Sequence, residues 1–122
     1  LHDALPSSGD HNLVGTREPL EILSGIGNAF DGAPLSHAEP LQLDSATAAT
    51  WEGSGGPFPP GRLDWFGYTS ARLDVVGGFV FDVGDLSERW RAAHHLQADD
   101  SKKSSDHRPV VVDVRWRGAR LP

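Results

Sequence analysis

The sequence Ser104-Ser105-Asp106-His107-Arg108-Pro109 leads directly into Val110-Val111-Val112-Asp113-Val114, the most apolar run of the chain. β-Branched residues favour strands, so this run predicts a final β-strand over residues 110–116. Strand side chains alternate between faces, so one face of this strand carries Val110, Val112, Val114 and Trp116. The chain is therefore expected to be organised around a strand that begins at a polar turn.

The polar turn places an acid and an imidazole next to each other, where a rigid strand can hold them at a surface. Such a placement is typical of a functional site. In the alternative interpretation, Asp106 and Arg108 are solvated turn residues and His107 packs at the strand edge. A short motif taken alone favours that alternative, because short motifs often occur by chance.

Size and composition predict a single unit over residues 1–122. The chain has a mass of 13.1 kDa, and a domain of this length buries roughly 65% of its unfolded surface. No apolar run approaches the roughly 18 residues that a membrane span needs, so we expect no span. No Cys is present, which excludes disulfides, thiolate metal sites and a cysteine nucleophile.

Charge narrows the class of function. A net charge of −6 argues against a protein that holds nucleic acid by neutralising many phosphates. It still allows an enzyme of phosphate esters, in which a metal ion and a few Arg residues offset the substrate charge. The chain begins at Leu1 without a targeting segment, so we expect a mature or trimmed product. The compartment stays open, with a soluble, secreted or periplasmic protein favoured.

Asp10 and Asn12 occupy alternate positions in the segment 9–15. In an extended segment both side chains point to the same side and can share one pocket. Alternatively, the two side chains bind nearby backbone groups in an Asx-type turn.

Residues 62–68 alternate as a strand that places Asp64 on a face with aromatic residues. Burying an unpaired carboxylate costs several kcal/mol, so Asp64 is expected to have a partner. Arg62 is the local candidate, and His107 is the candidate that would create a site.

Helical spacing predicts a short helix over residues 16–23 and a second helix over about 86–96. The second helix is expected to begin at a capping box over 85–88. Within it, the adjacent His94-His95 pair diverges by about 100° and is better suited to the helix C-terminus than to one metal ion. Residues 97–105 are interpreted as a solvated polar loop.

Apolar runs predict strand structure over residues 72–76 and 78–83, as one strand interrupted at Gly77-Gly78 or as two short strands. Gly, Pro, Ser, Ala and Thr make up most of residues 27–61, which show little periodicity, and this predicts a long loop containing a short strand at 47–51. A loop of that length is either a functional edge or a mobile insertion.

Three polar motifs fall at strand ends: Gly-Asp-His-Asn at 9–12, Arg-Leu-Asp-Trp at 62–65 and Ser-Asp-His-Arg-Pro at 105–109. In this order they resemble the C-terminal half of the endonuclease/exonuclease/phosphatase superfamily, the DNase I-like phosphoesterases. The resemblance implies an α+β fold: half of a DNase I-like two-layer α/β sandwich, with one mostly antiparallel sheet and short helices on its outer face.

The resemblance also implies a role for each matching residue. Asp10 matches the acid that orients or deprotonates the attacking water, and Asn12 matches the amide that contacts the phosphoryl oxygens. Asp64 matches the carboxylate that holds the catalytic imidazole, and His107 matches that imidazole, which binds the scissile phosphate. Asp106 matches a ligand of the divalent metal; oxygen ligands favour Mg²⁺, with Mn²⁺ or Ca²⁺ as alternatives.

The chain also departs from the family pattern. The segment before Gly9 is short and polar where the family has an apolar strand, and His11 replaces a hydrophobic residue. Trp51 matches only loosely the aromatic residue that precedes the Arg-Leu-Asp strand. The family's N-terminal half, which brings the Asn and Glu of the principal metal site, has no counterpart in this chain. We therefore expect that half as a second chain, which would cover the apolar inner face of the sheet.

The leading functional hypothesis is a divalent-metal-dependent phosphoesterase, a nuclease-like hydrolase of phosphodiesters or phosphomonoesters that is completed by the N-terminal half. Nucleic acid is one candidate substrate, although the charge does not favour it. The alternative is a non-catalytic binding or structural module with the same half-fold, in which residues 27–61 form the recognition surface. A third hypothesis is a zinc-binding protein that uses His94 and His95.

Overall fold

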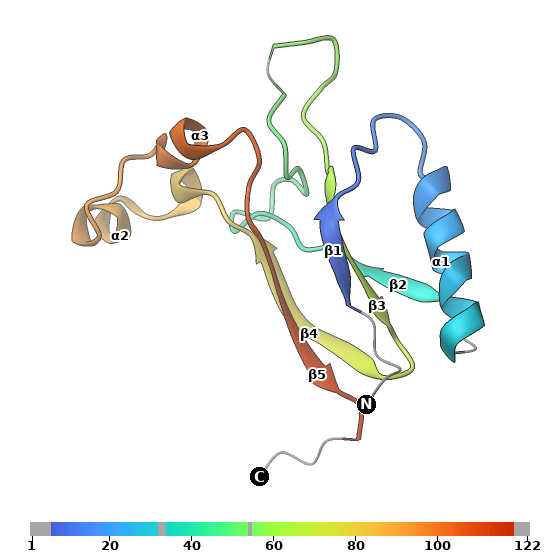
Figure 1. Cartoon of the computed structure of the whole chain (residues 1–122). Helices are drawn as coiled ribbons and strands as arrows, with labels where there is room; N and C mark the ends of the chain where they lie inside the picture. Colours follow the sequence, from blue (N-terminus) through green and yellow to red (C-terminus); the bar gives the residue numbers. More distant parts are fainter. Residues whose placement is uncertain (1–5, 32–33, 54, 119–122) are drawn as a thin grey trace.

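The computed structural model of the chain describes residues 6–31, 34–53 and 55–118 (Figure 1). The fold is α+β, as predicted, with a three-stranded and a two-stranded antiparallel sheet and a few helices. The prediction of one sheet is wrong for the described residues. The chain leaves the first sheet at a tight turn over 70–72, where the Arg72 N–H donates to the Thr69 carbonyl (3.0 Å), and the next strand pairs with the distant last strand instead.

The first sheet is centred on β3 (Asp64–Thr69), with β1 (Ser7–Asp10) on one side and β2 (Leu35–Ala38) on the other. Along β3, the buried positions Trp65, Gly67 and Thr69 alternate with half-buried ones, as the sequence pattern predicted. In Figure 1, α1 (Glu18–Asp31) lies beside this sheet, next to β2.

The second sheet pairs β4 (Leu73–Val80) with β5 (Val110–Trp116), the strand predicted from the valine run. β4 is one strand, so the single-strand alternative is the correct one of the two. Its irregularity lies between Val75 and Gly77 rather than at Gly77-Gly78, and the strand ends at Val80 rather than at residue 83. The four residues predicted to form the apolar face of β5 pair, in sequence order, with Val80, Gly78, Val75 and Leu73 of β4. At the end of β5 far from the polar turn over 104–109, the described residues leave this face uncovered, since Val114 is 43% and Trp116 49% exposed.

Gly78 of β4 lies against the backbone of β5. A Cβ atom there would be 2.8 Å from the Val111 carbonyl oxygen, whereas one at Gly77 would have its nearest neighbour, an Asp113 carboxylate oxygen, at 3.5 Å. Gly78→Ala is therefore expected to lower the free energy of unfolding by about 1–3 kcal/mol, because backbone rather than a flexible side chain must move. Urea denaturation measures the change, and Gly77→Ala is the matched control; equal stability of the two variants would contradict the prediction.

Helix α1 begins close to the predicted position, where the Thr16 hydroxyl accepts the Glu18 N–H (2.9 Å), and Leu20 anchors it in the core at 4% exposure. It continues to Asp31, well beyond the predicted end at residue 23. The predicted loop over 27–61 is therefore wrong at its beginning, because it contains the end of α1 and all of β2.

The remainder of that loop, over residues 39–53 and 55–61, is irregular. The predicted strand at 47–51 does not form; within 47–51 Trp51 alone makes isolated bridges, to Gly61 and to His107. The Thr47 hydroxyl instead accepts the Ala49 N–H (3.1 Å), a local turn bond that competes with strand pairing.

The predicted helix over 86–96 is shorter than expected. Asp82 caps a 3₁₀ turn, η1 (Val83–Asp85), and the N-cap of α2 (Glu88–Ala93) is Ser87, so the predicted 85–88 capping box is wrong. Helix α2 ends because His95 is left-handed, with φ of 56°. The predicted polar loop also contains a short helix, α3 (Asp100–Ser104).

The core is small and lies between α1, the two sheets and η1. Its buried hydrophobic members are Leu20, Ala38, Leu63, Trp65, Leu73, Val80 and Val83. In Figure 1, α2 and α3 lie together at one end of the second sheet. Within the described residues, no helix is long and apolar enough to cross a membrane.

Candidate functional site

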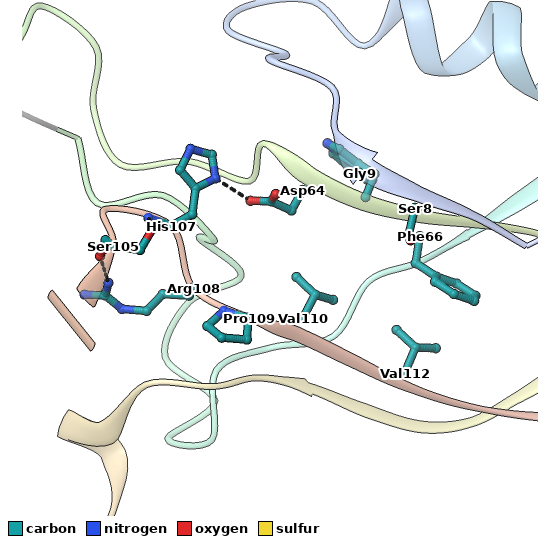
Figure 2. A pocket seen from close by; sticks show the side chains of 11 residues that line it. Ser8, Gly9, Asp64, Phe66, Ser105, His107, Arg108, Pro109, Val110 and Val112 are labelled. Carbon is teal, nitrogen blue, oxygen red and sulfur yellow. Dashed lines mark hydrogen bonds and ion pairs between the residues drawn. The ribbon is translucent and has the colours of Figure 1, made fainter. Parts of the chain in front are cut away.

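Asp64 and His107 form the centre of the candidate site. Asp64 is the first residue of β3, and His107 lies in the turn just before β5, so each is held at the end of a strand. The imidazole Nδ1 lies 2.8 Å from a carboxylate oxygen of Asp64 (Figure 2). A carboxylate only accepts hydrogen bonds, so Nδ1 carries the proton in this pair and Nε2 faces outward to other groups.

The surroundings of His107 favour its charged form. The hydrogen bond to Asp64 raises the pKa of His107 above its ordinary value, and the negative charges of Asp64, Asp10 and Asp106 act in the same direction against partial burial. The site therefore holds a cationic imidazole more readily than a solvated histidine does.

Arg62, the other candidate partner, is used elsewhere. Its guanidinium donates to the backbone carbonyls of Ala48 (3.2 Å), Ala38 (3.3 Å) and Pro40. The same group lies 5.3 Å from the ring centre of Trp65. Arg62 thus links the loop after β2 to the first sheet. The Asp64 carboxylate therefore pairs with the imidazole of His107 rather than with Arg62.

Asp10 reaches the imidazole from β1. One carboxylate oxygen lies 4.0 Å from Nε2 of His107, and the other accepts the N–H of Asn12 (2.8 Å). Asn12 is left-handed, with φ of 48°, so the segment is not extended beyond Asp10 and the expectation of two side chains on one strand face is wrong. The Asx-type turn forms instead, and Asp10 still faces the site. Asn12 is exposed in that turn, and no contact between described residues joins it to the imidazole.

Asp106 points to a different group. A carboxylate oxygen accepts the indole N–H of Trp51 (3.0 Å), and the side chain is exposed. Among the described residues, no group of three or more His or acidic side chains could hold a metal ion. Asp106 is thus a single carboxylate that lacks a ligand set in this part of the chain, and it does not by itself fit a metal site.

Arg108 is a buried structural residue, so its interpretation as a solvated turn residue is wrong. The whole residue is 3% exposed. Its Nε donates to Asp82 (2.5 Å), its other nitrogens to Glu52 and to the Ser105 carbonyl (3.1 Å). No local pattern indicates this network, because Glu52 and Asp82 are 56 and 26 positions away from Arg108.

The pKa values in this network follow from the pairing. Burial acts to raise the pKa of Asp82, but the N–H of Gly84 and the Arg108 guanidinium outweigh burial and the pKa is lowered. Burial acts to lower the pKa of Arg108, but the carboxylates of Asp82 and Glu52 outweigh burial and the pKa is raised. Asp82 and Arg108 are therefore both charged at neutral pH.

A cleft of about 570 Å³ opens beside the Asp64–His107 pair. In Figure 2 the pair lies toward one end, and Phe66 and Val112 lie at the other. The cleft lies between the two sheets, since its lining residues are Ser8, Gly9, Asp64, Trp65, Phe66, Ser105, His107, Arg108, Pro109, Val110 and Val112. The site thus combines a charged mouth with an apolar floor.

The His94-His95 pair lies just beyond the end of α2. His94 is the C-cap of α2 and stacks on Trp90, with ring centres 5.1 Å apart and planes 10° apart. The position at the helix C-terminus agrees with the preferred sequence interpretation, and no metal-binding group that includes these residues occurs in the described ranges.

The raised pKa of His107 predicts a pH-dependent stability. A group whose pKa is raised on folding adds stability below its unfolded pKa of about 6.5, and this stability is lost as pH rises through the folded pKa. Asp64→Asn is therefore expected to cost about 1–2 kcal/mol of unfolding free energy at pH 5.5 and less at pH 9. Denaturant unfolding in EDTA at both pH values checks this, and a cost that grows with pH would contradict it.

No family model matches the chain, and neither a curated protein nor a solved structure matches it.

Proposed function

We propose that this chain carries part of the active site of a divalent-metal-dependent phosphoesterase, which hydrolyses a phosphodiester or phosphomonoester with an activated water. The observation that supports this most strongly is the Asp64–His107 hydrogen bond, with Asp10 on the far side of the same imidazole. The three residues come from segments far apart in the sequence. Asp64 and His107 line one cleft, and Asp10 lies beside the imidazole of His107.

The chemistry of these residues suits hydrolysis of an anionic ester. A cationic His107 binds a phosphoryl oxygen and stabilises the charge that develops in the transition state, while Asp64 holds the imidazole in one tautomer. The oxygen of the attacking water bonds to phosphorus while the bond from phosphorus to the ester oxygen breaks. Asp10 accepts a proton from this water. The resemblance adds Asn12, whose amide would contact the phosphoryl oxygens.

A divalent cation, Mg²⁺ first and Mn²⁺ or Ca²⁺ as alternatives, supplies charge neutralisation to such a reaction when bound. Asp106 is the one residue that the resemblance assigns to it. The other ligands must then come from polypeptide outside the described residues, so the metal requirement and the need for a partner form one proposal.

The partner proposed is the N-terminal half of the same domain, as a second chain. The uncovered apolar end of the β5 face, with Val114 and Trp116 about half exposed, supports a polypeptide cover. Nucleic acid stays a candidate substrate, and a secreted or periplasmic location stays part of this proposal.

Hydrolysis assays test the proposal. The purified material is incubated with a generic phosphodiester and a generic phosphomonoester, in Mg²⁺ and in EDTA, and its subunits are identified by mass spectrometry and native chromatography. We expect Mg²⁺-dependent hydrolysis in fractions that also contain a second polypeptide. A folded, monomeric chain of 13 kDa without hydrolysis would contradict the proposal.

The alternative is a non-catalytic binding or structural module. One observation favours it: the described residues do not assemble a metal ligand set. This alternative predicts a stable, folded protein with the same Asp64–His107 pair and no hydrolysis in any fraction, with or without the second polypeptide.

A further inference from the structure

The Asp64–His107 pair is assembled from two different sheets. Asp64 begins β3 in the first sheet, and His107 precedes β5 in the second. β3 and β5 belong to separate ladders, so strand pairing does not fix the carboxylate relative to the imidazole. The position of the pair must depend on whatever joins the sheets at this end.

Residues 50–52 hold the Asp64 side of the pair. Thr50 is completely buried, and its hydroxyl oxygen accepts the N–H groups of both Leu63 and Asp64, each at 3.0 Å. The backbone of Trp51 exchanges hydrogen bonds with Gly61, at 3.0 and 3.1 Å. The start of β3 is thereby fixed to this segment by side chain and backbone together.

The same three residues hold the His107 side. The Arg108 N–H donates to the Thr50 carbonyl (2.6 Å), and the Glu52 N–H donates to the Asp106 carbonyl (3.2 Å). These two bonds flank His107 in sequence. Residues 50–52 therefore lie between the segment that leads into β3, which carries Asp64, and the turn that carries His107. They resemble a very short strand that is hydrogen-bonded on both edges.

Side chains reinforce the second attachment. The Glu52 carboxylate pairs with the Arg108 guanidinium, whose side chain is 1% exposed. Arg108 also donates to the Ser105 carbonyl and to Asp82, which follows β4. Glu52 thus reaches the loop of His107 through a buried cation that has little freedom to move.

We propose that residues 50–52 position the Asp64–His107 pair, with the Thr50 hydroxyl fixing the carboxylate and Glu52, acting through Arg108, fixing the imidazole. Thr50 and Glu52 are positioning residues, because neither contacts the imidazole ring. The catalytic consequence rests on the proposed function, whereas the geometry of the pair does not.

The tautomer of neutral His107 reports on this geometry. When Nδ1–H donates to Asp64, the proton stays on Nδ1, and when the contact is lost it redistributes to Nε2. Imidazole nitrogen chemical shifts of the ¹⁵N-labelled intact protein, recorded at alkaline pH in EDTA, give the tautomer ratio. The resonances of His107 are assigned from their loss in His107→Gln.

We expect Thr50→Val and Glu52→Gln each to lower the Nδ1–H to Nε2–H ratio of His107 about tenfold, which corresponds to about 1.4 kcal/mol. Thr50→Ser keeps the hydroxyl and is expected to keep the wild-type ratio. Thr47→Val is the matched control in the same loop, because its hydroxyl bonds only to nearby backbone.

Folded Thr50→Val and Glu52→Gln variants with the wild-type ratio would overturn the proposal, as would an equal loss in Thr47→Val. If Thr50→Val does not fold, Glu52→Gln decides, because the Glu52 side chain is 37% exposed and the substitution is mild. Absence of hydrolysis by the wild-type protein contradicts the proposed function alone, since the tautomer measurement needs no activity.

Discussion

Replacing Arg108 with Met is expected to lower the free energy of unfolding by about 3–5 kcal/mol, the usual cost of removing one partner from a buried ion pair. The Asp82 side chain, 16% exposed, would lose its cation, and Glu52 would lose the same partner. A loss of that size is a large part of the stability of a small domain, so the variant is expected to be largely unfolded at 37 °C.

Urea denaturation followed by circular dichroism measures this effect. Lys103→Met is the control, because its pair with Asp99 is exposed on both sides and is expected to leave the unfolding midpoint close to that of the wild type. Adding Asp82→Asn to Arg108→Met should recover part of the loss, since it removes the buried uncompensated charge. An Arg108→Met variant as stable as Lys103→Met would show that the network does not stabilise the fold.

His107→Ala is expected to reduce kcat/KM for phosphate-ester hydrolysis by about 10²–10⁴-fold, the usual contribution of one positioned acid–base or charge-stabilising group. The substitution removes the cation that faces the cleft and leaves Asp64 without its partner. Steady-state kinetics measure the loss, with Mg²⁺ and the proposed second polypeptide both present.

His94→Ala is the matched control, because His94 stacks on Trp90 at the end of α2 and lies away from the cleft lining. It is expected to keep wild-type kinetics. Equal activity of His107→Ala and the wild type would remove the proposed site, provided that circular dichroism shows both to be folded.

The parts of the fold that were predictable have a strong local pattern. β3 and β5 have clear alternation or β-branched runs, and both were located to within two residues. β2 and the second half of α1 were missed because Gly and Pro near them indicate a loop, whereas β2 pairs with β3 and α1 packs beside β2 in the folded chain. Tertiary contacts of that kind override local propensity.

The site was predictable only where chemistry alone demands a partner. A half-buried carboxylate on β3 required a cation, and this left His107 or Arg62 as candidates. Nothing local indicated that Thr50 would accept two backbone N–H groups or that Arg108 would be buried, because their partners are brought close only by the folded chain. The turn at Asn12 was foreseeable, since Asx turns compete with extended structure.

The bridges at Trp51 also bear on how the molecule opens. Proteins open locally in cooperative units, and the hydrogen bonds of residues 50–52 lie outside both ladders. Opening at residues 50–52 separates the carboxylate from the imidazole without breaking the pairing within either ladder. On heating, the site is therefore expected to be lost before global melting, so the temperature at which the site is lost is set by the hydrogen bonds of residues 50–52.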